Sequence, residues 1–335
     1  MKSKKYQGFT CFDFYLSKLE VLLNKATSQK NPALWLYRNN ARTPLFMLEA
    51  LSRAYAAMYP EFKFSKLDAR FKVLEDALGA IDYYDAFAKE FAINKAIPAP
   101  VLTYLQAMTR EKTQNFNEIL KEKSWITDKD PKIEKIRSKM SEIKWRKEAA
   151  DIKAIKEYYD LSIKEIIKFT RRSDFHFENV EADVHELRRK LRWLSIYPQA
   201  FCGSIQLSKV PKVPAHLKKY LTKEIVSSPF NKLPDAGDKK HFLILEQNHF
   251  YALSWMIAEL GKLKDEGLRV IVIKEALQQN TSLSDADAFK QAYKITGTKQ
   301  LTIKKILDRS DDICKKYFAE KNLQHLVIGC GKIDK

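Results

Sequence analysis

The sequence predicts an all-α protein, and three observations support that class. Hydrophobic residues make up 45% of the 335 residues, which is enough for a folded core. Only 9 glycines and 11 prolines interrupt the chain, so few tight turns are expected. Apolar residues recur at spacings of three and four, the pattern of helices that bury one face.

Apolar periodicity and helix-breaking residues give the expected helix boundaries. Pro44 lies inside the second helix and should kink or split it. Gly79 lies inside the third, where glycine usually marks close packing of another element. The β-branched run 270–273 has strand propensity but helical neighbours, so we predict helix there. The expected helices are 11–27, 32–58, one from Ser65 (its N-cap) that ends before Pro98, a long charged helix within 101–175 interrupted at Asp130-Pro131, 180–197 (ending before Pro198), 215–225, 241–261 and 302–322.

The chain is strongly basic, with 60 Lys and Arg against 42 Asp and Glu, a formal net charge of +18. Such a surplus attracts polyanions: nucleic acid, an anionic membrane surface or inorganic polyphosphate. No apolar run has the length of a membrane span or of a signal peptide, so we expect a cytoplasmic protein. The cysteines are far apart and form no C-x-x-C pair, which argues against disulfides and zinc. They are Cys11, Cys202, Cys314 and Cys330.

One stretch, 183–194, combines an apolar stripe with a basic face. On a helix its cationic residues fall within an arc of roughly 100°. Guanidiniums in such a row match phosphate oxygens, and a histidine among them adds a donor. A solvated basic face on an amphipathic helix would give the same pattern. The stripe is Val184, Leu187, Leu191 and Leu194, and the basic face is His185, Arg188, Arg189 and Arg192.

The same order of features occurs twice along the chain. Arg38 and Arg42 precede a helix that contains Leu78-Gly79-Ala80-Ile81-Asp82, with Asp85 following. His185-Glu186-Leu187-Arg188 precedes, after an insertion, a helix with Leu260-Gly261-Lys262-Leu263-Lys264-Asp265. Each half would hold about four helices, as expected for a duplicated bundle. We therefore divide the chain into an N-terminal helix (1–30), a first half (31–174), a second half (175–322) and a loosely attached tail (323–335).

These motifs resemble the conserved histidine α-helical domain (CHAD) family over roughly residues 32–320. Members of that family have an H-x-x-R helix in each half, followed by a helix ending L-G-x-x-R-D-x-D or L-G-x-L-N-D. The second half matches this pattern well. In the first half Arg42 matches the arginine, but Asn39 replaces the histidine and Asp82-Tyr83 replaces the Arg-Asp pair.

The resemblance implies two four-helix bundles related by pseudo-two-fold symmetry around a basic central cavity that binds inorganic polyphosphate. It also implies association with polyphosphate granules. We expect the basic row of 183–194 to form one wall of this cavity. Arg38 and Arg42 would face that row from the other half, and Lys262 and Lys264 would close the ends. The altered first half leaves open a one-sided site, or a scaffold that has lost part of it.

Nucleic acid is the alternative ligand, although most aromatic residues lie in apolar stripes and no zinc-finger, RNA-recognition or KH signature occurs. No P-loop, G-x-S-x-G or H-E-x-x-H motif occurs either, so we expect no enzyme. His176 and His185 are nine residues apart on different faces, and the arginines nearby would repel a cation. We therefore expect neither a metal site nor a cofactor.

Overall fold

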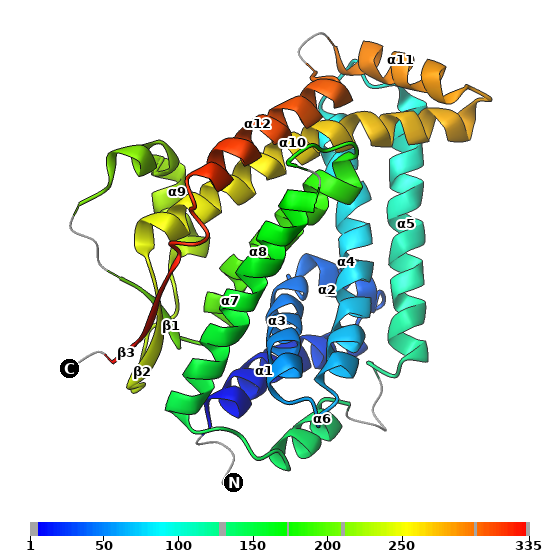
Figure 1. Ribbon diagram of the computed structural model, residues 1–335. Coiled ribbons are helices and arrows are strands. Elements are labelled where there is room, and N and C mark those ends of the chain that lie inside the picture. Colours follow the sequence, from blue (N-terminus) through cyan, green and yellow to red (C-terminus); the bar gives the residue numbers. More distant parts are fainter. Residues whose placement is uncertain (1–5, 127–131, 173, 209–211, 298–299, 333–335) are drawn as a thin grey trace.

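The computed structural model describes residues 6–126, 132–172, 174–208, 212–297 and 300–332. Most of these residues are helical, which confirms the predicted dominance of α-structure (Figure 1). The long helices are α1 (Gln7–Thr27), α3 (Arg42–Met58), α4 (Phe64–Ala92), α5 (Ala99–Glu122), α7 (Glu148–Arg172), α8 (Glu186–Ala200), α10 (Gln247–Asn280), α11 (Asp285–Thr296) and α12 (Ile303–Ala319). Shorter ones are α2 (Pro32–Arg38), α6 (Lys132–Ser141), α9 (Lys223–Ser227), the π-helix η2 (Val180–His185) and the 3₁₀ turns η3 (Ala215–Tyr220) and η4 (Pro229–Asn231).

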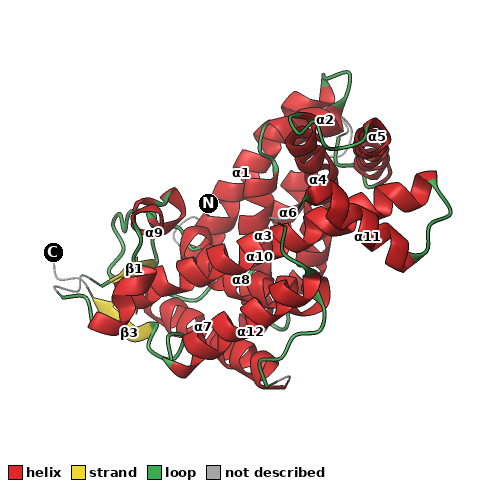
Figure 2. Ribbon diagram, turned by 90° about the horizontal axis from the view of Figure 1, so that it is seen from above, coloured by secondary structure: helices red, strands yellow, loops and turns green. Residues whose placement is uncertain are grey.

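Helix α8 lies at the centre of the molecule and packs against α3, α7 and α10 (Figures 1 and 2). The apolar stripe predicted for 183–194 runs from η2 into α8 and is confirmed, because each of its members is completely buried. These residues are Val184, Leu187, Leu191 and Leu194. A smaller apolar cluster joins α4 and α5 to α10 and α11, and it includes the run 270–273, which is helical as predicted.

A small three-stranded sheet, which the sequence analysis did not anticipate, lies at one edge of the molecule (Figure 2). Its strands are β1 (Ile205–Leu207), β2 (His241–Leu245) and β3 (Val327–Lys332). Strand β2 pairs with β1 in parallel and with β3 in antiparallel orientation. Residues 241–245 were wrongly assigned to a helix, since a short apolar run has no period that distinguishes strand from helix.

The C-terminal segment is also more ordered than expected. Leu323 and Leu326 are buried, and β3 pairs with β2 over its length. The prediction of a loosely attached tail is therefore wrong for residues 323–332.

Several helix boundaries differ from those expected. The helix predicted for 32–58 splits into α2 and α3, and the break lies at Asn40, whose φ is +55°, just before Pro44. The charged region 101–175 forms α5, α6 and α7. The break between α6 and α7 was not predicted; it lies around buried Trp145, whose Nε1 donates to the carbonyl of Met140 at 2.9 Å. Asp130-Pro131 lies outside the described residues. Helix α8 continues through Pro198 to Ala200, and α4 begins at Phe64 without a side-chain cap from Ser65.

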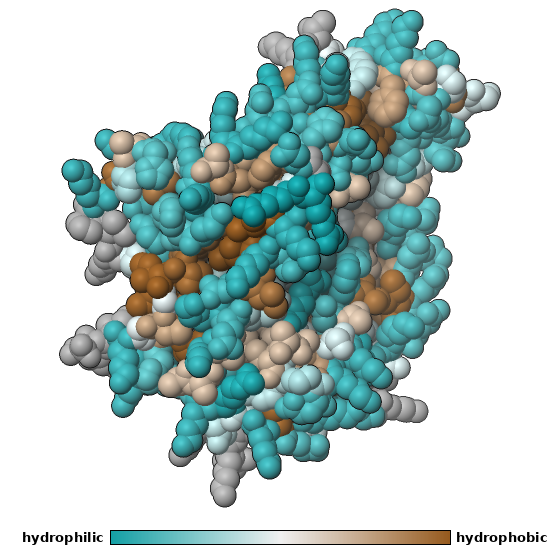
Figure 3. Space-filling model, in the orientation of Figure 1, coloured by the Kyte–Doolittle hydropathy of each residue, from teal (hydrophilic) through white to brown (hydrophobic). Residues whose placement is uncertain are grey.

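The visible surface is mostly polar. On the face shown in Figure 3 most side chains are hydrophilic, and apolar side chains gather in patches near its centre. None of the described helices combines the length and hydropathy that crossing a bilayer requires.

Candidate anion-binding site

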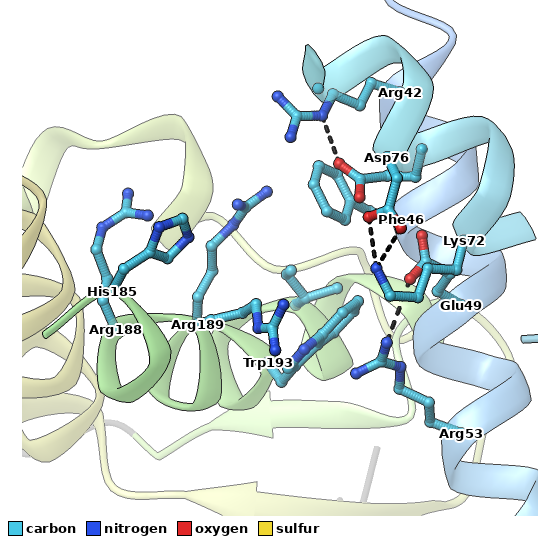
Figure 4. Close-up of a pocket in the computed structure, with 14 residues that line it drawn as sticks. Arg42, Phe46, Glu49, Arg53, Lys72, Asp76, His185, Arg188, Arg189 and Trp193 are labelled. Atoms are coloured by element: carbon cyan, nitrogen blue, oxygen red, sulfur yellow. Dashed lines mark hydrogen bonds and ion pairs between the residues drawn. The ribbon is translucent and has the colours of Figure 1, made fainter. Parts of the chain in front are cut away.

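The basic helix and the pair α3/α4 enclose a cavity of about 260 Å³, which we call the arginine cavity. One wall comes from η2 and α8 and carries the basic row His185, Arg188, Arg189 and Arg192. The other wall comes from α3 and α4 and carries cations and carboxylates together. Its charged residues are Arg42, Glu49, Arg53, Lys72, Glu75 and Asp76. Figure 4 shows these two sets of side chains on either side of the cavity.

A second cavity of about 650 Å³ adjoins the first, because Arg42, Gly79 and His185 line both. It extends between α4 and α10, where Lys264 and Arg269 contribute cations. Four carboxylates line it as well, so its charge is mixed. They are Asp82, Glu90, Glu181 and Asp265.

Local structure fixes the start of the basic helix. The side chain of Asn179 accepts hydrogen bonds from the amides of Glu181 and Ala182 at 2.8 and 2.9 Å, which caps η2. The wide π turn then leads directly into α8. Such turns insert an extra residue and change the direction of the side chains around them. His185 is the last residue of this turn, and it faces both cavities.

The structure brings together six of the eight predicted site residues. His185, Arg188, Arg189, Arg192 and Arg42 line the arginine cavity, and Lys264 lines the adjoining one.

Arg38 and Lys262 line neither cavity, so their expected positions are wrong. Arg38 is exposed at the end of α2, and the break at Asn40 removes it from the helical face of Arg42. Lys262 is 72% exposed and pairs with Glu259 at 2.6 Å.

An arginine packs on a glycine in each of two helix pairs, α3/α4 and α8/α10. A Cβ atom added to Gly79 on α4 would lie 2.8 Å from the Nη2 of Arg42. A Cβ added to Gly261 on α10 would lie 2.9 Å from the Nε of Arg188. The close packing expected at Gly79 is thus confirmed. In both pairs the missing side chain of glycine lets the guanidinium lie directly against the helix backbone.

We predict that Gly261→Ala weakens anion binding about fivefold to tenfold without destabilising the protein. The new methyl group displaces Arg188, whose Nε donates to the carbonyl of Ile257 at 3.2 Å. Alanine also favours helix over glycine by roughly 1 kcal/mol, which compensates for the contact. Titration with polyphosphate and urea denaturation measure the two effects. Gly79→Ala is the matched control and should have the smaller effect on binding; equal losses would contradict the prediction.

The cations of the α3/α4 wall already have carboxylate partners. Arg42 binds Glu75 at 2.5 Å through Nε and Asp82 at 3.0 Å through Nη1. Lys72 binds Asp76 at 2.5 Å. Arg53 likewise pairs with Asp68 at 3.1 Å and with Glu49 at 3.4 Å. Each of these three cations is therefore already held in an ion pair.

On the opposite wall, Arg188 and Arg192 have no carboxylate within ion-pair distance among the described residues. Burial lowers the pKa of Arg188. Burial and the nearby guanidiniums of Arg188 and Arg42 lower the pKa of Arg192 to about 10. Removing a cation from water without a partner costs free energy. An anion placed between these two arginines would recover that cost.

Comparison of the chain with family models, with curated proteins and with solved structures returned no match.

Aromatic rings hold the guanidiniums in place. The guanidinium of Arg192 lies 4.1 Å from the ring centroid of Phe46, and that of Arg53 lies 4.2 Å from the ring of Trp193. The two rings contact each other edge-on at 6.1 Å between α3 and α8. Stacking on an aromatic face favours a cation and fixes its plane. The arginines are thus oriented before any ligand binds.

The outer cations of the basic row have partners that an anion can replace. His185 pairs with Glu181 at 2.9 Å and Arg189 with Glu186 at 2.6 Å, each within one helical turn. Partly exposed pairs of this kind contribute little to stability. Their cations are available to a more highly charged ligand.

Sequence reasoning missed the carboxylates of the site. Glu49, Glu75 and Asp76 were not predicted, because acidic residues on amphipathic helices usually face solvent. One signal was present: Glu49 lies four residues after Leu45 and three before Ser52, both buried, within the apolar stripe of α3. A charged residue at such a position indicates a buried functional or structural contact. No group of three or more His, Cys, Asp or Glu in the described ranges is arranged to hold a metal ion.

Proposed function

We propose that this protein binds a phosphate-rich anion, inorganic polyphosphate, in the arginine cavity between the helix pairs α3/α4 and α8/α10, and that it does so without catalysis. The observation that carries the proposal is the pair of half-buried guanidiniums, Arg188 and Arg192, that form no ion pair with a carboxylate of the described residues. Arginine forks bind phosphate oxygens with charge-assisted hydrogen bonds. A phosphate between these residues would offset both their desolvation and their mutual repulsion.

The repeated arginine–glycine contact supports an origin by duplication. Arg42 on Gly79 and Arg188 on Gly261 occupy matching places in the two motifs that resemble the CHAD family. We infer two halves related by pseudo-two-fold symmetry, in which the second half retains free cations and the first has paired its own. The site is then one-sided, and the polyphosphate chain contacts α8 more than α3 and α4.

A one-sided site sets the salt dependence of binding. Contacts from the three arginines of the basic row imply a slope of log K against log salt of about −2, since each phosphate contact on a flexible chain releases about 0.7 counterion. Affinity should thus fall by about 20-fold between 50 and 200 mM salt. A much steeper slope would indicate that the whole surface of +18 net charge binds the anion.

The test is a filter-binding titration with long-chain polyphosphate, and single-stranded RNA and heparin serve as competitors. We expect polyphosphate to bind and RNA of equal total charge to compete at least about tenfold less well. Equal competition by RNA would replace the proposal with nucleic-acid binding, the alternative ligand. The length of the polyphosphate is followed over the same hours, and its shortening would show an enzyme instead. No binding of any of the three polyanions would leave a scaffold role.

A further inference from the structure

We propose that Glu49 is an additional anion-binding residue, which faces the bound phosphate as a neutral carboxylic acid and donates a hydrogen bond to it. This inference rests on the proposed function and extends it: the site binds an anion with a proton donor as well as with arginines, and its affinity depends on pH.

The first support is the position of Glu49. It lines the arginine cavity from α3, and its exposed fraction is only 1%. Its Oε2 accepts a long contact of 3.4 Å from the Nη2 of Arg53. Its Oε1 is buried and has no hydrogen-bond partner in the structure. A buried polar oxygen without a partner is costly, and a proton on it makes it a donor for a ligand.

The second support is the charge balance of the wall around Glu49. The cations there are Arg42, Arg53 and Lys72, and the carboxyl groups are Glu49, Asp68, Glu75, Asp76 and Asp82. Carboxyl groups exceed cations by two. The better contacts already go to other partners, since Arg53 binds Asp68 at 3.1 Å and Arg42 binds Glu75 at 2.5 Å. The most buried carboxyl group, Glu49, is therefore the one that is most easily neutral.

The electrostatic surroundings agree with this assignment. Burial, followed by the neighbouring carboxylate of Glu75, raises the pKa of Glu49 to about 8. Arg53 and Lys72 oppose the shift, and Asp68 adds to it. From α8 the group that faces Glu49 is the guanidinium of Arg192. At pH 7 most Glu49 side chains are thus protonated.

The direction of the pH dependence follows from this protonation state. A phosphate binds beside neutral Glu49 and is repelled by ionised Glu49, so binding raises the pKa of that carboxyl group further. Affinity is highest below the pKa of the free protein, about 8, and falls as the pH rises above it. Between pH 7 and pH 9 the neutral fraction falls about tenfold, and the affinity should fall by the same factor. The affinity is compared only up to pH 9, because Arg192, whose pKa is lowered to about 10, would lose its own charge at higher pH.

The experiment measures the Kd for long-chain polyphosphate at pH 7, 8 and 9 in wild type, Glu49→Gln and Glu186→Gln. The internal phosphates of polyphosphate have only strongly acidic protons. The charge of the polyphosphate chain is therefore nearly constant between pH 7 and pH 9. Glutamine has the shape of the neutral acid and keeps a donor. Glu186→Gln adds the same charge, but its carboxylate pairs with Arg189 and Lys190 and lines neither cavity.

We expect the Kd of the wild type to rise about tenfold from pH 7 to pH 9 and that of Glu186→Gln to rise equally. The Kd of Glu49→Gln should stay within about twofold of the wild-type value at pH 7. Calorimetry of the wild type in buffers of different ionisation enthalpy supplies a readout that needs no variant: binding at pH 8 should take up about half a proton.

A wild type that binds with a flat pH profile, or a Glu49→Gln variant with an unchanged slope, would overturn the role of Glu49 and leave the proposed function intact. A folded Glu49→Gln variant that fails to bind at pH 7 would also overturn it. A wild type that binds no polyphosphate at any pH would refute the proposed function and this inference together.

Discussion

Replacing Arg188 and Arg192 by alanine together should raise the Kd for polyphosphate about 30-fold or more. Each guanidinium is expected to contribute more than about 1 kcal/mol through charge-assisted hydrogen bonds. Two such losses correspond to this factor. The structural reason is that, among the residues that the structure describes, no carboxylate lies within ion-pair distance of these two cations. The measurement is a binding titration at fixed salt concentration.

The same double variant should bind more weakly than the wild type without being less stable. The free protein bears the cost of burying both guanidiniums beside Arg42, as the lowered pKa of Arg192 indicates. The double variant should therefore unfold at the same or at a higher urea concentration than the wild type. Lys144 and Lys147, both exposed and outside the two cavities, form a control pair with the same change of net charge. An equal loss of affinity from Lys144→Ala and Lys147→Ala would show a diffuse charge effect and contradict the site.

Gly203→Ala should destabilise the fold by about 3 kcal/mol or more. Gly203 has a φ of +88° in the turn that joins α8 to β1, a conformation that L residues avoid. A Cβ atom there would lie 2.1 Å from the backbone carbonyl oxygen of Asp235. Neither backbone segment can move easily, because Gln206 donates hydrogen bonds to the carbonyls of Gly203 and Pro234. Urea denaturation measures the loss.

Gly237→Ala is the matched control for this substitution. Gly237 also has a positive φ, +59°, but a Cβ there would meet nothing within 4 Å. Gly237→Ala should lower the free energy of unfolding by only about 1 kcal/mol, which is the cost of a positive φ without a steric clash. A loss at Gly203 no larger than that at Gly237 would show that the close approach of Asp235 contributes nothing.

The two helix pairs differ in their charge chemistry although they repeat one contact. On α4, Glu75 precedes Gly79 by four residues and neutralises Arg42. On α10, Ile257 stands four residues before Gly261 and offers Arg188 only its carbonyl oxygen. In the pair α3/α4, Arg42 is therefore held in an ion pair. In the pair α8/α10, Arg188 forms no ion pair among the described residues, so it can contact a ligand. This difference underlies the proposed one-sided site.

Much of the candidate site could be predicted from local sequence. The apolar stripe and the basic face of 183–194 follow from helical spacing, because residues three and four apart share a face whatever surrounds the helix. The glycine at 79 was recognisable for a similar reason, since glycine inside a helix weakens it unless something packs there.

Features that depend on contacts between distant segments could not be predicted. Strand β2 pairs with residues 205–207 and 327–332, and nothing in its five residues specifies those partners. The removal of Arg38 from the site depends on a helix break that a residue with positive φ creates.

The sequence by itself determined that the protein is helical, that it is basic, and that one helix carries a row of basic residues beside an apolar stripe. Only the tertiary structure decided which of these cations are free. Arg42 forms ion pairs with Glu75 and Asp82 across 33 and 40 residues of chain, whereas Arg188 and Arg192 have no carboxylate within ion-pair distance in the part of the chain that the structure describes. Periodicity is a property of neighbouring residues, but the partner of a charge is decided by how the helices pack.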